Sequence, residues 1–189
     1  MFIRFYRFSR LIGYFEHPYS ILCFFYIDDH TRYYWIYLIK HHSKYFEIYT
    51  TFHALIRTQH STVMKCFRGD FGGEYTSNKF YELLALYRTI YQTLCIDTLE
   101  QNDIVEIKHR HIVKTTRSLL LFAYVPSMFW DETVLTTIGL INTILSSHIS
   151  GFSPFEKLYG YAPNYFFFRV FGCTCFILRP HVEHNKLSS

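Results

Sequence analysis

Two carboxylates in this sequence occupy positions from which they could share one metal ion. Asp70 closes a predicted strand in the stretch CFRGDFGGEY, just before paired glycines, and Glu106 falls in the first turn of a predicted long helix. If that helix packs beside the strand, the two groups can converge on a divalent cation, because hard cations prefer oxygen ligands. The residues alone leave a simpler interpretation open, in which Asp70 forms a turn and Glu106 complements the helix dipole.

The same predicted helix carries a row of basic residues close to Glu106. Arg110, Lys114 and Arg117 recur at three- and four-residue spacing, which places them on one face of a helix, and Lys108 lies nearby. Basic helix faces contact DNA phosphates, so we predict nucleic-acid contacts at these four positions. A solvated surface produces the same pattern, and the sequence leaves that alternative open.

A zinc site is a third candidate. Cys173 and Cys175 would project from one face of a strand and are followed by His181 and His184, which are zinc-ligand types without the spacing of a standard finger. The residues alone leave two interpretations open, a zinc site and ordinary strand cysteines, and the family resemblance given below implies the second. The chain has five cysteines, an odd and scattered set that favours buried free thiols in a reducing, intracellular compartment.

The composition is that of a globular protein. Half of the 189 residues are hydrophobic, 21% are aromatic and only 18% are charged, which excludes a disordered chain. A net charge of +4 and a pI near 8.7 permit a polyanionic partner without requiring one. No apolar run approaches the roughly 18 residues that span a bilayer, so we expect no membrane segment.

The elements that must position these residues follow from the hydrophobic pattern. Two apolar runs at 20–27 and 33–39, separated by DDHTR, are typical of a β-hairpin. An irregular stretch is expected at 95–103. The other predicted elements are strands at 2–11, 62–67, 89–94 and 168–178, and helices that begin at Ser43 and span 78–87, 104–122, 127–145 and 155–160.

Several blocks of the sequence stand in an order that resembles one known family. The integrase core of copia-type LTR retrotransposon Pol polyproteins is similar, in order, to the blocks YIDDHTRYYWIYLIKHHSKYFEIYTTFHALI, RGDFGGEYTSNKF, EQNDIVEIKHRHIVKTTRSLLL, VPSMFWDETVLTTIGLIN, SPFEKLYGYAP and RVFGCTCF. The resemblance implies a ribonuclease-H-like α/β fold, with a mixed sheet flanked by helices. It also implies DNA strand transfer by an Asp, Asp, Glu triad that holds two Mg²⁺ ions.

The resemblance divides the chain into two parts. It assigns residues 1–150 to a catalytic core that is truncated at its N-terminus. It assigns residues 151–189 to a linker and the truncated start of a small SH3-like β unit.

Carried over residue by residue, the family's triad is incomplete in this chain. Its second aspartate falls on Asp70 and its glutamate on Glu106, which makes these two the predicted catalytic and metal-binding residues. Its first aspartate, within a His-Ser-Asp-x-x-Gly-Pro stretch, falls on Arg10. Asp28 and Asp29 correspond to the hairpin turn, remote from the metals. Arg10 removes a ligand and places a positive charge where a cation must sit, so we predict that the site is inactive.

Other departures from the family pattern agree with this prediction. The residue after Asp70, usually Asn, is Phe71, and the glycine of the Gln-Asn-Gly turn is Asp103. A proline before that turn is Leu99, and the arginine after the glutamate is Ile107. Each change loses a polar, flexible or preset backbone position beside the active site.

The resemblance and the residues together predict an integrase-core-like protein that binds nucleic acid and does not catalyse integration. The alternatives are an active Mg²⁺-dependent polynucleotidyl transferase and a non-functional relic or interaction module. The expected partners are DNA and a second copy of the chain, with no membrane and no small-molecule substrate. The expected location is intracellular, and nuclear if the protein functions.

Overall fold

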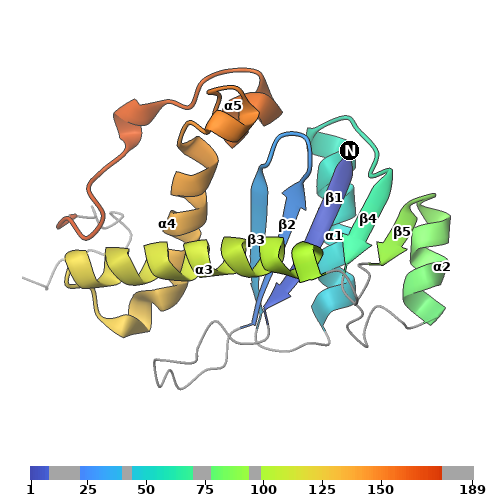
Figure 1. Ribbon diagram of the computed structural model, residues 1–189, viewed down its shortest axis with the longest axis horizontal. Coiled ribbons are helices and arrows are strands. Elements are labelled where there is room, and N and C mark those ends of the chain that lie inside the picture. Colours follow the sequence, from blue (N-terminus) through green and yellow to red (C-terminus); the bar gives the residue numbers. More distant parts are fainter. Residues whose placement is uncertain (9–21, 40–43, 70–77, 94–98, 176–189) are drawn as a thin grey trace, which may run out of the picture.

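The computed structural model describes residues 1–8, 22–39, 44–69, 78–93 and 99–175, with the backbone alone described at 2, 4–8, 22–24, 69, 93 and 99–106. Five strands form one sheet in the order β3-β2-β1-β4-β5 (Figure 1). Strand β1 pairs antiparallel with β2 and parallel with β4, and β5 is parallel to β4. The strands are β1 (Phe2–Phe8), β2 (Leu22–Asp28), β3 (Tyr34–Ile39), β4 (Cys66–Gly69) and β5 (Ile90–Thr93).

The predicted hairpin is confirmed, with β2 and β3 paired antiparallel and Tyr26 opposite Trp35. Its turn is fixed by Asp28, whose Oδ2 accepts hydrogen bonds from the Thr31 N–H at 2.9 Å and the Thr31 hydroxyl at 2.8 Å. Because side chains alternate along a strand, Phe25 and Tyr26 enter two different cores on the two faces of the sheet.

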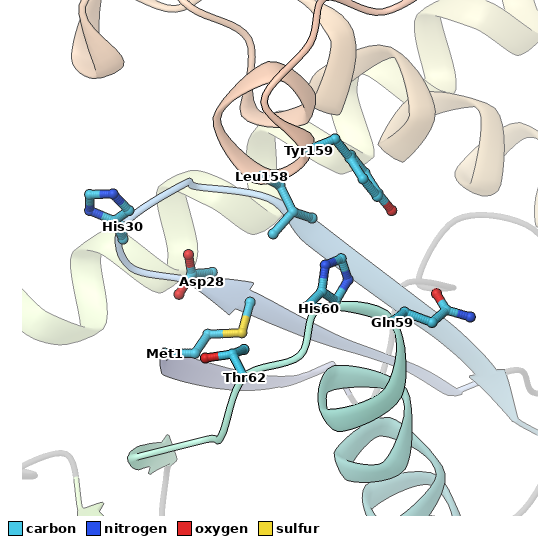
Figure 2. A pocket seen from close by; sticks show the side chains of 8 residues that line it. All are labelled: Met1, Asp28, His30, Gln59, His60, Thr62, Leu158 and Tyr159. Carbon is cyan, nitrogen blue, oxygen red and sulfur yellow. The ribbon is translucent and has the colours of Figure 1, made fainter.

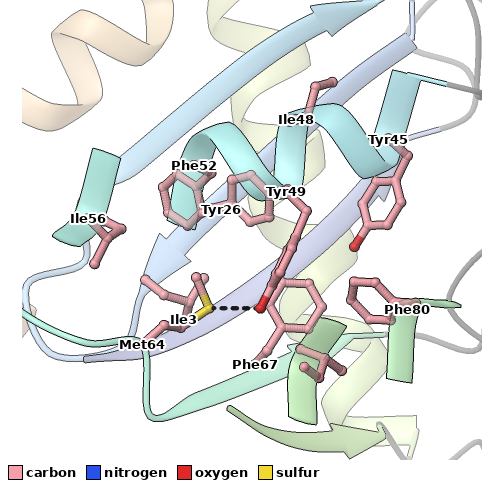
Figure 3. Close-up of a cluster of buried hydrophobic side chains, with 11 residues drawn as sticks. Ile3, Tyr26, Tyr45, Ile48, Tyr49, Phe52, Ile56, Met64, Phe67 and Phe80 are labelled. Carbon is pink, nitrogen blue, oxygen red and sulfur yellow. Dashed lines mark hydrogen bonds between the residues drawn. The ribbon is translucent and has the colours of Figure 1, made fainter. Parts of the chain in front are cut away.

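The core on one face is aromatic. Helices α1 (Tyr45–Gln59) and α2 (Asn78–Leu86) contribute to it, and α1 lies behind the strands in Figure 1. Tyr26 stacks on Phe52 with ring centroids 4.0 Å apart, and the hydroxyl of Tyr49 donates to the Met64 sulfur at 3.8 Å (Figure 3). Phe67 on β4 meets Tyr49 edge-on at 5.2 Å. Part of the 21% aromatic content is therefore buried core.

The core on the other face is largely aliphatic. Helix α3 (Leu99–Phe122) crosses in front of the strands in Figure 1 and packs on α4 (Trp130–Thr143), which follows the short helix η2 (Ser127–Phe129). The hydroxyls of Thr116 and Thr137 join α3 to α4 at 3.0 Å. Asn142 holds α4 to the sheet edge, because its amide accepts from the Tyr34 N–H and donates to the Tyr34 carbonyl, both at 2.9 Å.

The predicted helices are present with shifted ends. Helix α3 begins at Leu99, five residues before the predicted start, so residues 99–103 are helical where an irregular stretch was expected. Helix α4 ends at Thr143, before the predicted end at 145. Within the described residues no single helix is long and apolar enough to cross a membrane, although one bent pair, Ser127–Thr143 with Ser147–Tyr159, has the length and composition.

The prediction of a strand at 168–178 is wrong for the residues that the structure describes. After α5 (Pro154–Tyr159) come the short helix η4 (Tyr165–Phe167) and a non-strand segment to residue 175. No described strand pairs with this segment, and an unpaired strand leaves its backbone groups without ladder partners. The SH3-like unit is therefore not seen in the described residues. The boundary at residue 150 stays a prediction.

Candidate nucleic-acid interface and catalytic positions

Two neighbouring parallel strands lead toward the predicted catalytic positions. Strand β1 ends at Phe8 and β4 ends at Gly69, with Arg4 level with Arg68 in the register between them. Arg10 and Asp70 follow these strands in the sequence and lie outside the described residues. Their roles stay predictions.

The composition of β1 shows that the family's first aspartate has no counterpart near Arg10, even if the alignment shifts by a few residues. Its seven residues, FIRFYRF, include two arginines and no carboxylate. The first acidic residue of the sequence is Glu16, well beyond the strand. Moving the expected aspartate by a few residues in either direction from Arg10 therefore still gives no carboxylate.

Glu106 lies within α3, seven residues after the helix begins at Leu99. The influence of the helix dipole falls off within the first turn, so the alternative role of Glu106 as a dipole partner loses its basis. The side chain of Glu106 is outside the described part of the structure. Among the described side chains, no group of three His, Cys, Asp or Glu residues is arranged to hold a metal ion.

The structure brings three of the four predicted nucleic-acid-binding residues together. Arg110, Lys114 and Arg117 are exposed on α3 and line a hollow of about 390 Å³ with His109 and Val113. The opposite side of this helix is buried through Ile112 and Thr116. Side chains three and four residues apart on a helix lie roughly 5–6 Å from one another at Cβ. The row can therefore place several cations along one polyanionic backbone.

Lys108 does not join that row. Its Nζ is buried and lies 5.7 Å from the centroid of the Tyr34 ring on β3. A position two residues before Arg110 faces away from it on a helix, which directs Lys108 to the sheet. Its place is at the contact of helix and sheet, so we leave it out of the interface.

The cysteines differ from the expectation of buried thiols. Cys66 is a buried free thiol, as predicted, and burial raises the pKa of its thiol. Cys173 and Cys175 are free and exposed, because the segment that carries them forms no strand. His181 and His184 lie outside the described residues, so the zinc alternative gains no support.

From the sequence, Asp28 was expected only to form the hairpin turn. Asp28 caps the hairpin turn as expected and also lines a hollow of its own. The sequence signal is a run of apolar residues, ILCFFYI, that continues directly into an aspartate. Nothing in that pattern indicates what surrounds the carboxylate.

The fold matches solved integrase cores. The HTLV-2 integrase catalytic core domain in complex with magnesium, in its trimeric form, aligns with a TM-score of 0.62 and 14% sequence identity. The match covers 84% of this chain and 95% of that one. The catalytic core domain of BIV integrase aligns with a TM-score of 0.58 and 11% identity, over 84% and 93% of the two chains. The described residues thus adopt the ribonuclease-H-like fold of an integrase catalytic core.

Curated relatives identify the lineage. The chain is 36% identical to the Retrovirus-related Pol polyprotein from transposon RE1 of Arabidopsis thaliana. This match extends over 161 residues, or 85% of the chain. It is 33% identical over 162 residues, or 86% of its length, to that from transposon TNT 1-94 of Nicotiana tabacum. No protein-family model matches. The chain is homologous to copia-type retrotransposon Pol polyproteins and spans 11% and 12% of the length of these two relatives.

Proposed function

We propose that this chain is an integrase core that binds nucleic acid through α3 and does not catalyse strand transfer. The observation that carries the first half is the exposed row of Arg110, Lys114 and Arg117 around one hollow. The second half rests on β1, which brings arginines and no carboxylate to the sheet.

The residues of β1 do not fit a magnesium pair. Two-metal phosphoryl transfer uses ions roughly 4 Å apart, and carboxylates must neutralise both of them. In integrase cores such as this chain resembles, one carboxylate comes from the first strand, where this chain has FIRFYRF followed by Ser9 and Arg10. Asp70 and Glu106 alone would leave half of the charge of two divalent ions uncompensated, so we derive no metal-dependent step for this chain.

Binding through α3 needs only the residues that are present. The helix is held rigid by its buried side and by the hydroxyl pair of Thr116 and Thr137 at 3.0 Å. Arginine and lysine on its exposed side attract phosphates and release the counterions condensed on DNA. Contacts of this kind read no base sequence, so the proposed binding is non-specific. DNA is the proposed partner, and a nuclear location belongs to the same proposal.

The test is the salt dependence of DNA binding, measured by fluorescence anisotropy with a labelled duplex. The triple variant Arg110→Ala, Lys114→Ala, Arg117→Ala should bind more weakly and reduce the slope of log K against log salt by about 2.7, at about 0.9 per lost phosphate contact.

The matched control removes three exposed cations elsewhere, by Arg57→Ala, Lys65→Ala and Lys79→Ala. Its net charge therefore equals that of the α3 triple variant. An equal loss of slope in both triple variants would mean that overall charge, not the α3 row, binds DNA. That result, or a wild-type chain without salt-dependent binding, would overturn the proposal.

A further inference from the structure

A second hollow lies at the end of the sheet where β1 and β4 begin. Its volume is about 570 Å³, within the range of roughly 300–1,000 Å³ that is typical of small-molecule sites. Asp28 at the end of β2, His60 after α1 and Tyr159 on α5 border it (Figure 2). Strand β1 has seven residues and is roughly 20 Å long, so the hollow is remote from the end of β1 at Phe8.

Asp28 gives the hollow a buried negative charge. The residue is 2% exposed, and its Oδ2 already accepts both hydrogen bonds from Thr31. Its Oδ1 is buried and has no hydrogen-bond partner among the described residues. Buried carboxylate oxygens are nearly always satisfied in native proteins, so the hydrogen bonds of the turn compensate the Asp28 carboxylate only in part.

The adjacent carboxylate shows that this arrangement is specific to Asp28. Asp29 does not line the hollow, and its Oδ1 lies 3.4 Å from Arg32 and its Oδ2 3.9 Å from Arg68. One aspartate of the pair is thus provided with arginines from the chain. Asp28, by contrast, lines a hollow whose lining residues include no lysine or arginine.

Histidine and tyrosine rings form the rest of the wall. His60 has a buried Nε2 without a hydrogen-bond partner among the described residues, and burial lowers the pKa of its imidazole. Its ring lies 5.6 Å from that of Tyr159 and 6.1 Å from that of Trp35. A neutral imidazole offers an acceptor nitrogen, and aromatic faces attract cations.

Met1 also lines the hollow, and its ammonium donates to the Val63 carbonyl at 3.2 Å. Burial lowers the pKa of this ammonium, and the charge of Asp28 opposes the shift. A metal ion is a poor occupant, because the described residues hold no group of three suitable ligands. The Met1 ammonium offsets part of the charge of Asp28, and the aromatic faces of the wall favour a cation over an anion.

From this geometry we propose that the hollow binds an organic cation, a guanidinium or alkylammonium group, against Asp28, His60 and Tyr159. The charged head is attracted by the buried carboxylate of Asp28, and its stem lies along the Tyr159 ring. Such a head occurs both on a basic side chain of a protein and on a free polyamine. This site is independent of the DNA interface proposed above.

The test is calorimetric titration with two cationic probes, N-acetyl-arginine methylamide and spermidine. We expect saturable binding of at least one probe to the wild-type chain, and the tighter probe identifies the source of the cation. N-acetyl-aspartate methylamide, which has the opposite charge, should give no saturable heat. Fluorescence of Trp35, whose ring is 6.1 Å from His60, should saturate at the same probe concentration.

The variant Asp28→Asn should weaken probe binding at least tenfold. It keeps a carbonyl oxygen for the Thr31 hydrogen bonds and removes the charge. The matched variant Asp29→Asn removes a neighbouring charge outside the hollow and should bind within twofold of wild type.

If Asp28→Asn does not fold, Tyr159→Leu provides a second test, with Tyr161→Leu as its control. Removal of the aromatic wall should weaken binding about threefold, and the control should not. The proposal is overturned if neither cation saturates the wild-type chain, or if each control loses as much affinity as its partner variant.

Discussion

The two ends of this sheet differ in the residues that the sequence brings to them. Where β1 and β4 end, the sequence continues to Arg10 and Asp70, and β1 itself contributes arginines. Where these strands begin, a carboxylate lies buried in a hollow without lysine or arginine in its lining. Both ends rest on the same cores, so one end of such a scaffold can lose its chemistry while the other keeps its structure. The fold alone therefore does not indicate what either end of the sheet binds or catalyses.

The largest effect should come from breaking the scaffold that both ends share. Phe67 on β4 is fully buried and meets Tyr49, Phe80 and Tyr26 in the aromatic core. Phe67→Ala should lower the free energy of unfolding by about 3–5 kcal/mol through lost burial and a cavity. Urea denaturation checks this value. A loss below about 1 kcal/mol would mean that the aromatic core is not packed as described.

The next effect should come from the helix layer alone. Asn142→Leu removes both hydrogen bonds to Tyr34 and leaves the backbone groups of that edge residue unpaired. The expected loss of stability is about 2 kcal/mol. Thr136→Val is the control, because Thr136 only returns a hydrogen bond to Glu132 of its own helix. Equal effects of the two variants in urea denaturation would contradict the role of Asn142.

The third prediction concerns metal binding at the end of the sheet where β1 and β4 finish. Arg10→Asp replaces a cation by the carboxylate ligand that the predicted alignment places there, so Mg²⁺ or Mn²⁺ should bind the variant at least tenfold more tightly than wild type. That factor is about 1.4 kcal/mol. Calorimetry measures both proteins. Tight binding to wild type would contradict the proposed inactivity, and binding to neither would show that the pocket has decayed beyond one residue.

The smallest effect should be a pH dependence at the other end. Burial lowers the pKa of His60 below its ordinary value of 6.5, so the imidazole is neutral at pH 7.5 and gains a charge only as the pH falls below 6.5. Asp28, the Met1 ammonium, His30 and Tyr159 share the hollow with it. Cation binding should therefore weaken a few-fold between pH 7.5 and 5.5. The variant His60→Gln should show a smaller change, and an equal change would assign the effect to another group.

Much of the fold was predictable because its signals are local. The apolar runs around DDHTR fixed the hairpin, and the spacing of Arg110, Lys114 and Arg117 placed them on one exposed face, as observed. The exclusion of Lys108 was not predictable, because it depends on the position of Tyr34 on a distant strand. The strand expected near Cys173 failed because a strand needs a partner, and the apolar pattern does not supply one.

The sequence by itself determined the lineage, the lack of a carboxylate on the first strand and the cationic row of α3. These are properties of residue types and short spacings, which survive without a three-dimensional context. Only the tertiary structure decided that Asp28 lies buried opposite His60 and Tyr159. Those residues are far apart in the chain, and their meeting depends on how β2, α1 and α5 pack at one end of the sheet.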